Sequence, residues 1–206
     1  MASNGPKPPR RMPTLSDSRD RMHGSVPDRA TSALLVLDMF SDFSFPGGAR
    51  AARLALPVAR RIASLKARLA QRRVPCVYVN DNLGRWRSDF PALLRRAAAA
   101  RGAPLVRLLR PQERDYCILK PKHSGFFDTP LDTILEALRV RRLILCGTMT
   151  PQCILFTATD AYVRDYELVV PSDCVLSLTR REQQLALYFL RSVLGARVCR
   201  AGALRH

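Results

Sequence analysis

From about residue 31 onward, the hydrophobic pattern alternates between short apolar runs and longer segments in which apolar residues recur at helical spacing. Short apolar runs are typical of buried strands, and the longer segments are typical of helices that cover a sheet. The pattern predicts strands near 33–37, 74–79, 115–119, 142–146, 167–171 and 196–200. It predicts helices near 57–72, 89–100, 130–139, 151–165 and 180–193. Because strands that alternate with helices form βαβ units, we expect an α/β fold with a mostly parallel, Rossmann-like sheet of six strands.

The segment 57–72 indicates how such a helix would lie against the sheet. Its apolar side chains recur every three or four residues and would face the sheet: Val58, Ile62, Leu65 and Leu69. Its basic side chains fall between them and would point into solvent: Arg60, Arg61, Lys66, Arg68 and Arg72. We therefore expect a helix that is buried on one side and solvated on the other.

One cysteine follows directly after a predicted strand, in the sequence Gly147-Thr-Met-Thr-Pro-Gln-Cys153. Thr150 and Pro151 are typical of the N-cap and first position of a helix, which would place Cys153 in its first turn. Free N–H groups and the helix dipole favour a thiolate there, so we expect a pKa below about 8.5 and a nucleophilic thiol. The alternative is a buried structural cysteine, which is the commoner role of a free Cys.

Two other predicted strands end in a charged residue, Asp38 and Lys120. The carboxyl ends of parallel strands meet at one edge of a sheet, where ligands bind, so these side chains and Cys153 are expected to lie together. The chain has 30 Arg and only 4 Lys, and a lysine at this point is a compact charge that fits beside a thiolate and a carboxylate. Taken singly, Asp38 could cap a turn and Lys120 could be a surface charge.

These residues belong to a series of motifs that resembles the isochorismatase-like cysteine hydrolases, a family that includes nicotinamidase and N-carbamoylsarcosine amidohydrolase. The resemblance runs from about Ala33 to Asp173 through Leu-Val-Leu-Asp38, Val77-Tyr-Val-Asn-Asp-Asn82, Lys120-Pro-Lys-His-Ser-Gly-Phe126, the Cys153 motif and Thr159-Asp-Ala161. It implies a three-layer α/β/α sandwich, an Asp38-Lys120-Cys153 catalytic triad and self-association into a homo-oligomer. Lys122 does not match the family pattern.

The resemblance also implies the chemistry, which is hydrolysis of a small amide, ureido or carbamoyl C–N bond through a thioester. Asp38 would be the general base and Lys120 would hold the charges in place. The backbone N–H groups of Met149 and Cys153 would receive the oxyanion, and the family implies a non-proline cis peptide between Thr148 and Met149. The alternatives are an isochorismatase-type hydrolase of a non-amide substrate, which would not need Cys153, and a basic nucleic-acid-binding protein.

Residues near these motifs are candidates for a small-molecule substrate pocket. A carboxylate base requires a dry site, and aromatic side chains could form its walls. The candidates are Phe43, Asn82, Trp86, Phe126, Phe127 and Thr150. Ordinary core packing is an equal explanation for the aromatic residues.

The histidine count bears on a metal site and on cofactors. The chain has three histidines, His23, His123 and His206, and the Asp-x-His pattern of nicotinamidase metal sites is absent. We therefore expect a member of the family without a metal or another cofactor. His123 stands where an aromatic residue is common, and we expect it to pack rather than to act in the reaction.

Composition bounds the remaining possibilities. With 206 residues and 47% apolar content the chain can bury the core of one domain, expected over 31–206. Residues 1–30, rich in Pro and Arg, are expected to form a disordered tail. No apolar run reaches the roughly 20 residues that span a bilayer, and six sparse cysteines indicate a reducing compartment, so we expect a cytoplasmic protein without a membrane partner.

The net charge of +17 raises the question of a nucleic-acid partner. The excess arginines fall on several segments and lack the regular aromatic interleaving of a stacking platform. From the sequence we therefore favour a general arginine-rich composition over specific nucleic-acid binding.

Overall fold

The computed structural model describes residues 29–85, 87 and 89–204. The predicted tail therefore lies outside the described residues, apart from its last two, and so does Trp86. The backbone N–H of Ala30 donates to Leu138 O at 3.1 Å, so the ordered domain is already in place at residue 30.

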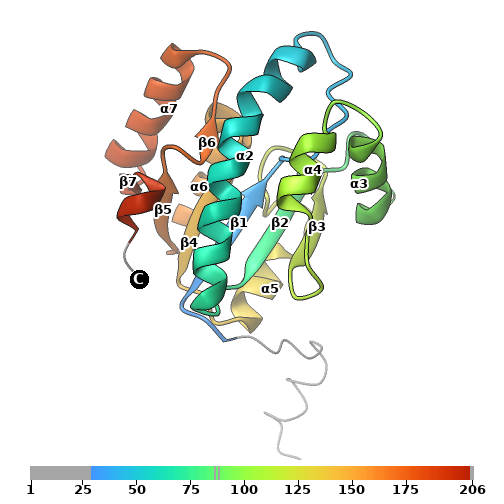
Figure 1. Cartoon of the computed structure of the whole chain (residues 1–206). Coiled ribbons are helices and arrows are strands. Elements are labelled where there is room, and N and C mark those ends of the chain that lie inside the picture. Colours follow the sequence, from blue (N-terminus) through green and yellow to red (C-terminus); the bar gives the residue numbers. More distant parts are fainter. Residues whose placement is uncertain (1–28, 86, 88, 205–206) are drawn as a thin grey trace, which may run out of the picture.

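A parallel sheet forms the centre of the molecule, as the hydrophobic pattern predicts (Figure 1). Six strands follow one another in the order β3-β2-β1-β4-β5-β7, and the short β6 pairs with β4. Their bounds are β1 Ser32–Leu37, β2 Cys76–Asp81, β3 Tyr116–Lys120, β4 Arg142–Thr148, β5 Glu167–Pro171, β6 Val175–Leu176 and β7 Arg197–Cys199. All the pairings are parallel, so the carboxyl ends of the strands meet at one edge.

Helices cover both faces of the sheet and make the three-layer sandwich (Figure 1). One layer contains α2 (Gly48–Gln71), α3 (Phe90–Ala98) and α4 (Ala103–Leu109). The other contains α5 (Leu131–Ala137), α6 (Leu155–Tyr162) and α7 (Arg180–Ser192). Two single turns complete the chain, the π-helical turn η1 (Thr150–Ile154) and the 3-10 turn η2 (Ala201–Ala203).

Strand β1 separates two apolar cores because its side chains alternate between the faces. Leu34 and Val36 pack under α2, whereas Leu35 and Leu37 face α5 and α6. Every residue of β1 is buried. A strand covered on both faces reads as a continuous apolar run, which is why the sequence identifies it so clearly.

Three elements differ from the sequence-based expectation. Helix α2 begins at Gly48, nine residues before the expected start, and continues through Pro57. Pro57 has no backbone N–H to donate, but it lies on the exposed side of the helix, where water can bond to the carbonyl that is left without a partner. Helix α4 was not expected, because Gly102 and Pro104 are typical of a turn, yet here they begin a helix. The two-residue β6 is too short to leave a pattern.

Lys66 also differs from the expectation that it points into solvent. Its side chain is 12% exposed and forms an ion pair with Asp115, whose side chain is 2% exposed. Its Nζ atom also donates to Tyr78 Oη at 3.0 Å. The long side chain reaches under the helix edge to a carboxylate that sequence spacing could not place.

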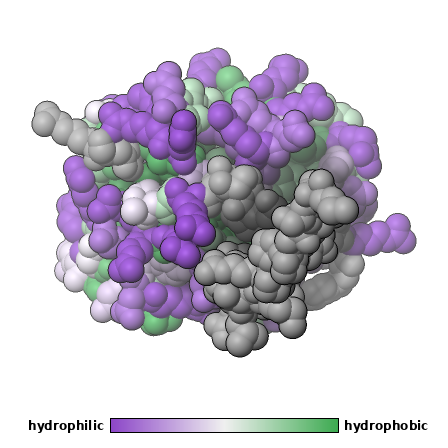
Figure 2. All heavy atoms as spheres, turned by 90° about the horizontal axis from the view of Figure 1, so that it is seen from below, coloured by the Kyte–Doolittle hydropathy of each residue, from purple (hydrophilic) through white to green (hydrophobic). Residues whose placement is uncertain are grey.

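None of the helices in the described part of the chain combines the length and the apolar character needed to cross a membrane. Seen from below, at the edge where the strands begin, the described surface is mainly hydrophilic with small scattered apolar patches (Figure 2).

Candidate active site

Asp38, Lys120 and Cys153 lie together at the carboxyl edge of the sheet. Asp38 follows β1, Lys120 ends β3 and Cys153 belongs to η1, which follows β4. Lys120 Nζ is 2.8 Å from Asp38 Oδ2 and 3.5 Å from Cys153 Sγ. The topology therefore brings into contact three side chains that are up to 115 positions apart in the sequence.

The Asp38 carboxylate is held by the backbone of its neighbours. Its Oδ1 atom accepts a hydrogen bond from the N–H of Asp81 at 2.6 Å. Its carbonyl oxygen accepts one from Thr148 Oγ1 at 2.8 Å, which links the ends of β1 and β4. Asp38 has a φ of 49°, a left-handed conformation that turns the chain away from the strand. The buried side chain of Asn80 stabilises this turn by bonding to both the N–H and the carbonyl of Phe40.

Lys120 is fully buried, and its ammonium is surrounded by acceptors. Besides Asp38 and Cys153, Nζ donates to Lys122 O at 3.0 Å and lies 3.9 Å from Asp81 Oδ2. Burial lowers the pKa of Lys120, but the negative charges of Asp38, a Cys153 thiolate and Asp81 outweigh burial and leave it raised. The lysine therefore stays positively charged in the interior.

Cys153 does not have the lowered pKa that its position in the sequence predicts. Burial raises the pKa of this thiol to about 12, the charge of Asp38 adds to the shift, and Lys120 opposes it. The turn that carries Cys153 is π-helical, and its N-cap is Met149 rather than Thr150. Thr150 Oγ1 instead donates to Gln183 Oε1 at 2.8 Å. The predictions of an activated thiolate and of a Thr150 cap were therefore wrong.

Burial also raises the pKa of Asp38, although Lys120, the Cys153 thiol and the Asp81 N–H lower it in part. A carboxylate with a raised pKa is a stronger base than a free aspartate. The site therefore rests as a thiol beside a basic carboxylate, and proton transfer between them would create the nucleophile.

Two further residues, Asp81 and His123, lie beside Lys120 and Cys153 respectively, a place that sequence reasoning did not give them. Asp81 ends β2 and supplies a second carboxylate to Lys120. Its position at the end of a strand, like that of Asp38, is the sequence feature that could have identified it. His123 was expected to pack, but it is exposed and its Nδ1 lies 3.7 Å from Cys153 Sγ. Its ring lies 5.3 Å from that of Phe156.

The candidate pocket residues have different surroundings. Asn82 adjoins Asp81, its N–H donates to Lys120 O, and its side chain accepts from Gly84 N at 2.9 Å. Phe43 is buried near Phe45, and Phe127 is 48% exposed. Phe126 is buried in the core of the α5–α6 layer, 6.1 Å from the ring of Tyr166, so core packing accounts for it.

A cis peptide bond joins Thr148 and Met149, just before the turn that carries Cys153. Gly147 precedes it with a φ of 121°, and a Cβ there would come 1.9 Å from Leu37 O. This close approach of β4 to β1 requires glycine. In the described residues, no group of three or more His, Cys, Asp or Glu is arranged to hold a metal ion.

Comparison with known proteins agrees with the fold. Residues 32–202 match the isochorismatase domain family. The chain is similar to "Uncharacterized isochorismatase family protein YaaI" of Bacillus subtilis (strain 168), with 35% identity over 170 residues, 82% of this chain and 94% of that protein. It is 37% identical over 92 residues, 44% of this chain and 39% of the relative, to the ureidoacrylate amidohydrolase RutB of Klebsiella pneumoniae. The crystal structure of N-carbamoylsarcosine amidase from Thermoplasma acidophilum superposes with a TM-score of 0.65 at 28% identity, covering 86% of this chain and 100% of that one.

Proposed function

Because this chain belongs to the isochorismatase family of hydrolases, we propose that it is a cysteine-dependent amidohydrolase acting on a small amide, ureido or carbamoyl C–N bond. The observation that carries this proposal is the contact of Lys120 with both the Asp38 carboxylate and the Cys153 thiol. The names of two similar proteins, a ureidoacrylate amidohydrolase and an N-carbamoylsarcosine amidase, support the substrate class.

The first half of the reaction forms a thioester. Asp38 takes the proton of the Cys153 thiol while Sγ attacks the substrate carbonyl carbon, and an S–C bond forms. The N–H groups of Met149 and Cys153, in the turn that carries the thiol, receive the oxyanion. The C–N bond then breaks, and the protonated Asp38 gives its proton to the departing ammonia or amine.

The second half releases the acid. Asp38, again a carboxylate, takes a proton from water, whose oxygen attacks the thioester carbon. The C–S bond breaks, the thiol recovers its proton from Asp38, and the product leaves as a carboxylic or carbamic acid. Lys120 keeps its positive charge throughout and stabilises whichever of its neighbours is negative.

The test is ammonia release from a panel of small amides, ureido acids and carbamoyl compounds by wild type, Cys153→Ala and Cys117→Ala. Cys117 is an exposed thiol outside the trio and serves as the matched control. We expect release by wild type and Cys117→Ala and none by Cys153→Ala. Added hydroxylamine should divert the acyl group to a hydroxamate, because it competes with water for the thioester.

Ammonia release that persists in Cys153→Ala would contradict the proposal. Equal cleavage of a non-amide substrate by wild type and by folded Cys153→Ala would support the isochorismatase-type alternative instead.

A further inference from the structure

Two stretches of the chain, 43–80 and 90–112, contain no acidic residue at all. Together they hold 13 basic residues and therefore account for 13 of the 17 net positive charges. The basic residues are Arg50, Arg53, Arg60, Arg61, Lys66, Arg68, Arg72, Arg73, Arg95, Arg96, Arg101, Arg107 and Arg110. In the sequence this excess looks dispersed because strand β2 and a loop separate its parts.

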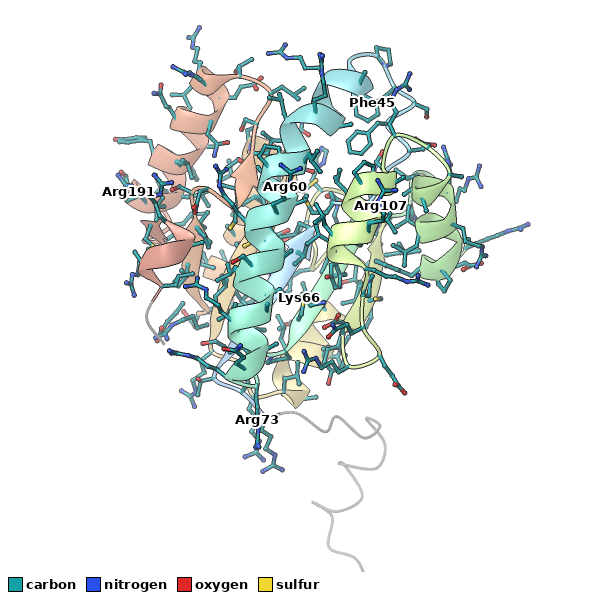
Figure 3. All side chains as sticks on the ribbon, viewed as in Figure 1. Phe45, Arg60, Lys66, Arg73, Arg107 and Arg191 are labelled. Carbon is teal, nitrogen blue, oxygen red and sulfur yellow. The ribbon has the colours of Figure 1, made fainter. Side chains whose placement is uncertain are left out.

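The fold places both stretches in the same layer. They form α2, α3 and α4, which cover one face of the sheet, with α4 packed against both α2 and α3 (Figure 1). Arg60 of α2 and Arg107 of α4 lie on the side of the molecule that faces the viewer in Figure 3. The tertiary structure thus brings onto one layer basic residues that lie in two separate stretches of the sequence.

Carboxylates neutralise little of this charge. Arg95, Arg96 and Lys66 form ion pairs with acidic residues that lie outside the two stretches. Several exposed arginines of these stretches form no ion pair within the described residues, and we name five of them, from α2 and the C-terminal end of α4, the α2–α4 face: Arg53, Arg60, Arg61, Arg107 and Arg110. The opposite layer differs, because there Arg164 pairs with both Asp132 and Asp160.

We infer that the α2–α4 face binds the phosphate backbone of double-stranded nucleic acid without reading its sequence. Arginine forms bidentate hydrogen bonds with phosphate and is the preferred residue for this contact. Helix α2 has 24 residues, so it is about 36 Å long, which matches roughly ten base pairs at ~3.4 Å each.

The composition of α2 argues against two other anionic partners. It contains no aromatic residue on which single-stranded bases could stack. Its large apolar side chains are not exposed, and in α4 only Leu108 is exposed, at 38%, so the two helices lack the row of apolar side chains that anchors a helix in a lipid surface. The α2–α4 face therefore presents mainly positive charge, and the regularly spaced phosphates of a duplex are the partner that such charges bind.

The site of hydrolysis is separate from this face, since Asp38, Lys120 and Cys153 lie at the carboxyl edge of the sheet. The inference therefore does not depend on the proposed amidohydrolase activity. Binding would hold the enzyme on a polyanion while its active site remains accessible.

The test compares two triple variants of the full-length protein with wild type. The face variant is Arg53→Gln/Arg60→Gln/Arg107→Gln. The control variant, Arg141→Gln/Arg181→Gln/Arg191→Gln, removes the same charge from exposed positions outside the α2, α3 and α4 layer. Fluorescence anisotropy measures binding to 24-base-pair DNA and RNA duplexes, to a single-stranded DNA of equal length and to phosphatidylglycerol vesicles, at several salt concentrations.

We expect wild type and the control variant to bind both duplexes with affinities within about 3-fold of each other, and the face variant to bind at least ~10-fold more weakly. The slope of log Kobs against log salt should be less steep by about 3 for the face variant, close to one per lost phosphate contact. Circular dichroism spectra that match that of wild type would establish that both variants are folded.

Four results would overturn the inference. The first is an equal loss of affinity in both variants, which would indicate a general effect of net charge. The second is no duplex binding by wild type at ~50 mM salt. The others are tighter binding to the single strand than to the duplex, and tighter binding to the vesicles than to the duplexes.

Discussion

At the scale of single residues, the protonation state of Cys153 depends on its burial and on the neighbouring charges. A helix terminus stabilises a negative charge by 0.3–1 kcal/mol, whereas the rise of the Cys153 pKa from 9.0 to about 12 corresponds to roughly 4 kcal/mol. Burial therefore outweighs the helix dipole, and Cys153 rests as a thiol. The sequence identified Cys153 but could not weigh burial against the helix dipole, because the exposure of the thiol is set by packing at the carboxyl edge of the sheet.

Asp38→Asn should separate thiol acidity from catalysis. Losing the carboxylate charge removes one cause of the raised Cys153 pKa while Lys120 remains, so the thiolate should form at lower pH. We expect iodoacetamide to modify Cys153 faster than in wild type, by about tenfold at pH 8.5 for each pH unit by which the pKa falls. Ammonia release should drop at least ~100-fold, because the base is gone.

The measurement is mass spectrometry of the Cys153 peptide at pH 7 to 10, with ammonia release assayed in parallel. Lys120→Gln is the matched comparison and should slow the alkylation, because its ammonium lowers the pKa of the thiol. Slower alkylation of Asp38→Asn than of wild type would contradict this account of the site.

At the scale of elements, the turn η1 that carries Cys153 is bonded to helix α7 through Thr150 and Gln183. Helix α7 begins with a capping box in which Thr179 and Glu182 bond to each other's backbone, and this fixes its first turn. The next residue, Gln183, accepts from Thr150 Oγ1 and donates to Val175 O at 3.5 Å. Gln183 thereby ties the turn η1 to strand β6.

Gln183→Leu tests this tie. Leucine has a similar volume but no polar group, so the buried Thr150 hydroxyl would lose its acceptor, at a cost of about 1–3 kcal/mol. We expect kcat to fall roughly tenfold or more with a smaller change in KM, since Cys153 would be positioned less well. Gln183→Glu keeps an acceptor oxygen and should retain most of the activity. Steady-state kinetics measures both, and a purely structural role would instead lower Tm without this split.

At the scale of the whole molecule, charge is unevenly divided between the layers. The α2, α3 and α4 layer holds 13 basic residues from stretches without acids, whereas the opposite layer carries both signs. Unpaired like charges repel and destabilise the folded state, and salt screens them over ~10 Å at 0.1 M. Stability should therefore depend on ionic strength.

We expect Tm to rise by roughly 2–4 °C between ~25 and ~250 mM NaCl, equivalent to about 1 kcal/mol for a protein of this size. The Arg53→Gln/Arg60→Gln/Arg107→Gln variant should have a higher Tm than wild type at low salt and a weaker salt dependence. Differential scanning calorimetry measures both. A Tm that falls with salt would mean that attractive ion pairs outweigh this repulsion.

Self-association, which the family resemblance implies, stays a prediction at this scale. Helix α7 presents an exposed apolar stripe made of Leu185, Tyr188, Phe189 and Val193. Such a patch is larger than single scattered apolar residues and is the surface to examine first.

The sequence alone determined the α/β class, the bounds of four of the six main strands within one residue, and the three residues, Asp38, Lys120 and Cys153, that meet at the sheet edge. Strand β1 is readable because a strand buried on both faces is a continuous apolar run, which Asp38 then interrupts. Strand β3, at the sheet edge, is only partly buried, but its short apolar run still ends in a charged residue, Lys120. The sequence did not reveal α4 or β6, since turn-forming residues and a two-residue strand carry no periodic signal.

The tertiary structure decided the properties that depend on packing between elements distant in the sequence. It made Cys153 a buried thiol, placed Asp81 and His123 beside the site, and brought arginines from two separate stretches onto one layer. Local periodicity reports which face of an element is buried, but burial depth and the distances between charges follow from packing among distant elements. Those quantities set the pKa of Cys153 and the charge of the α2–α4 face.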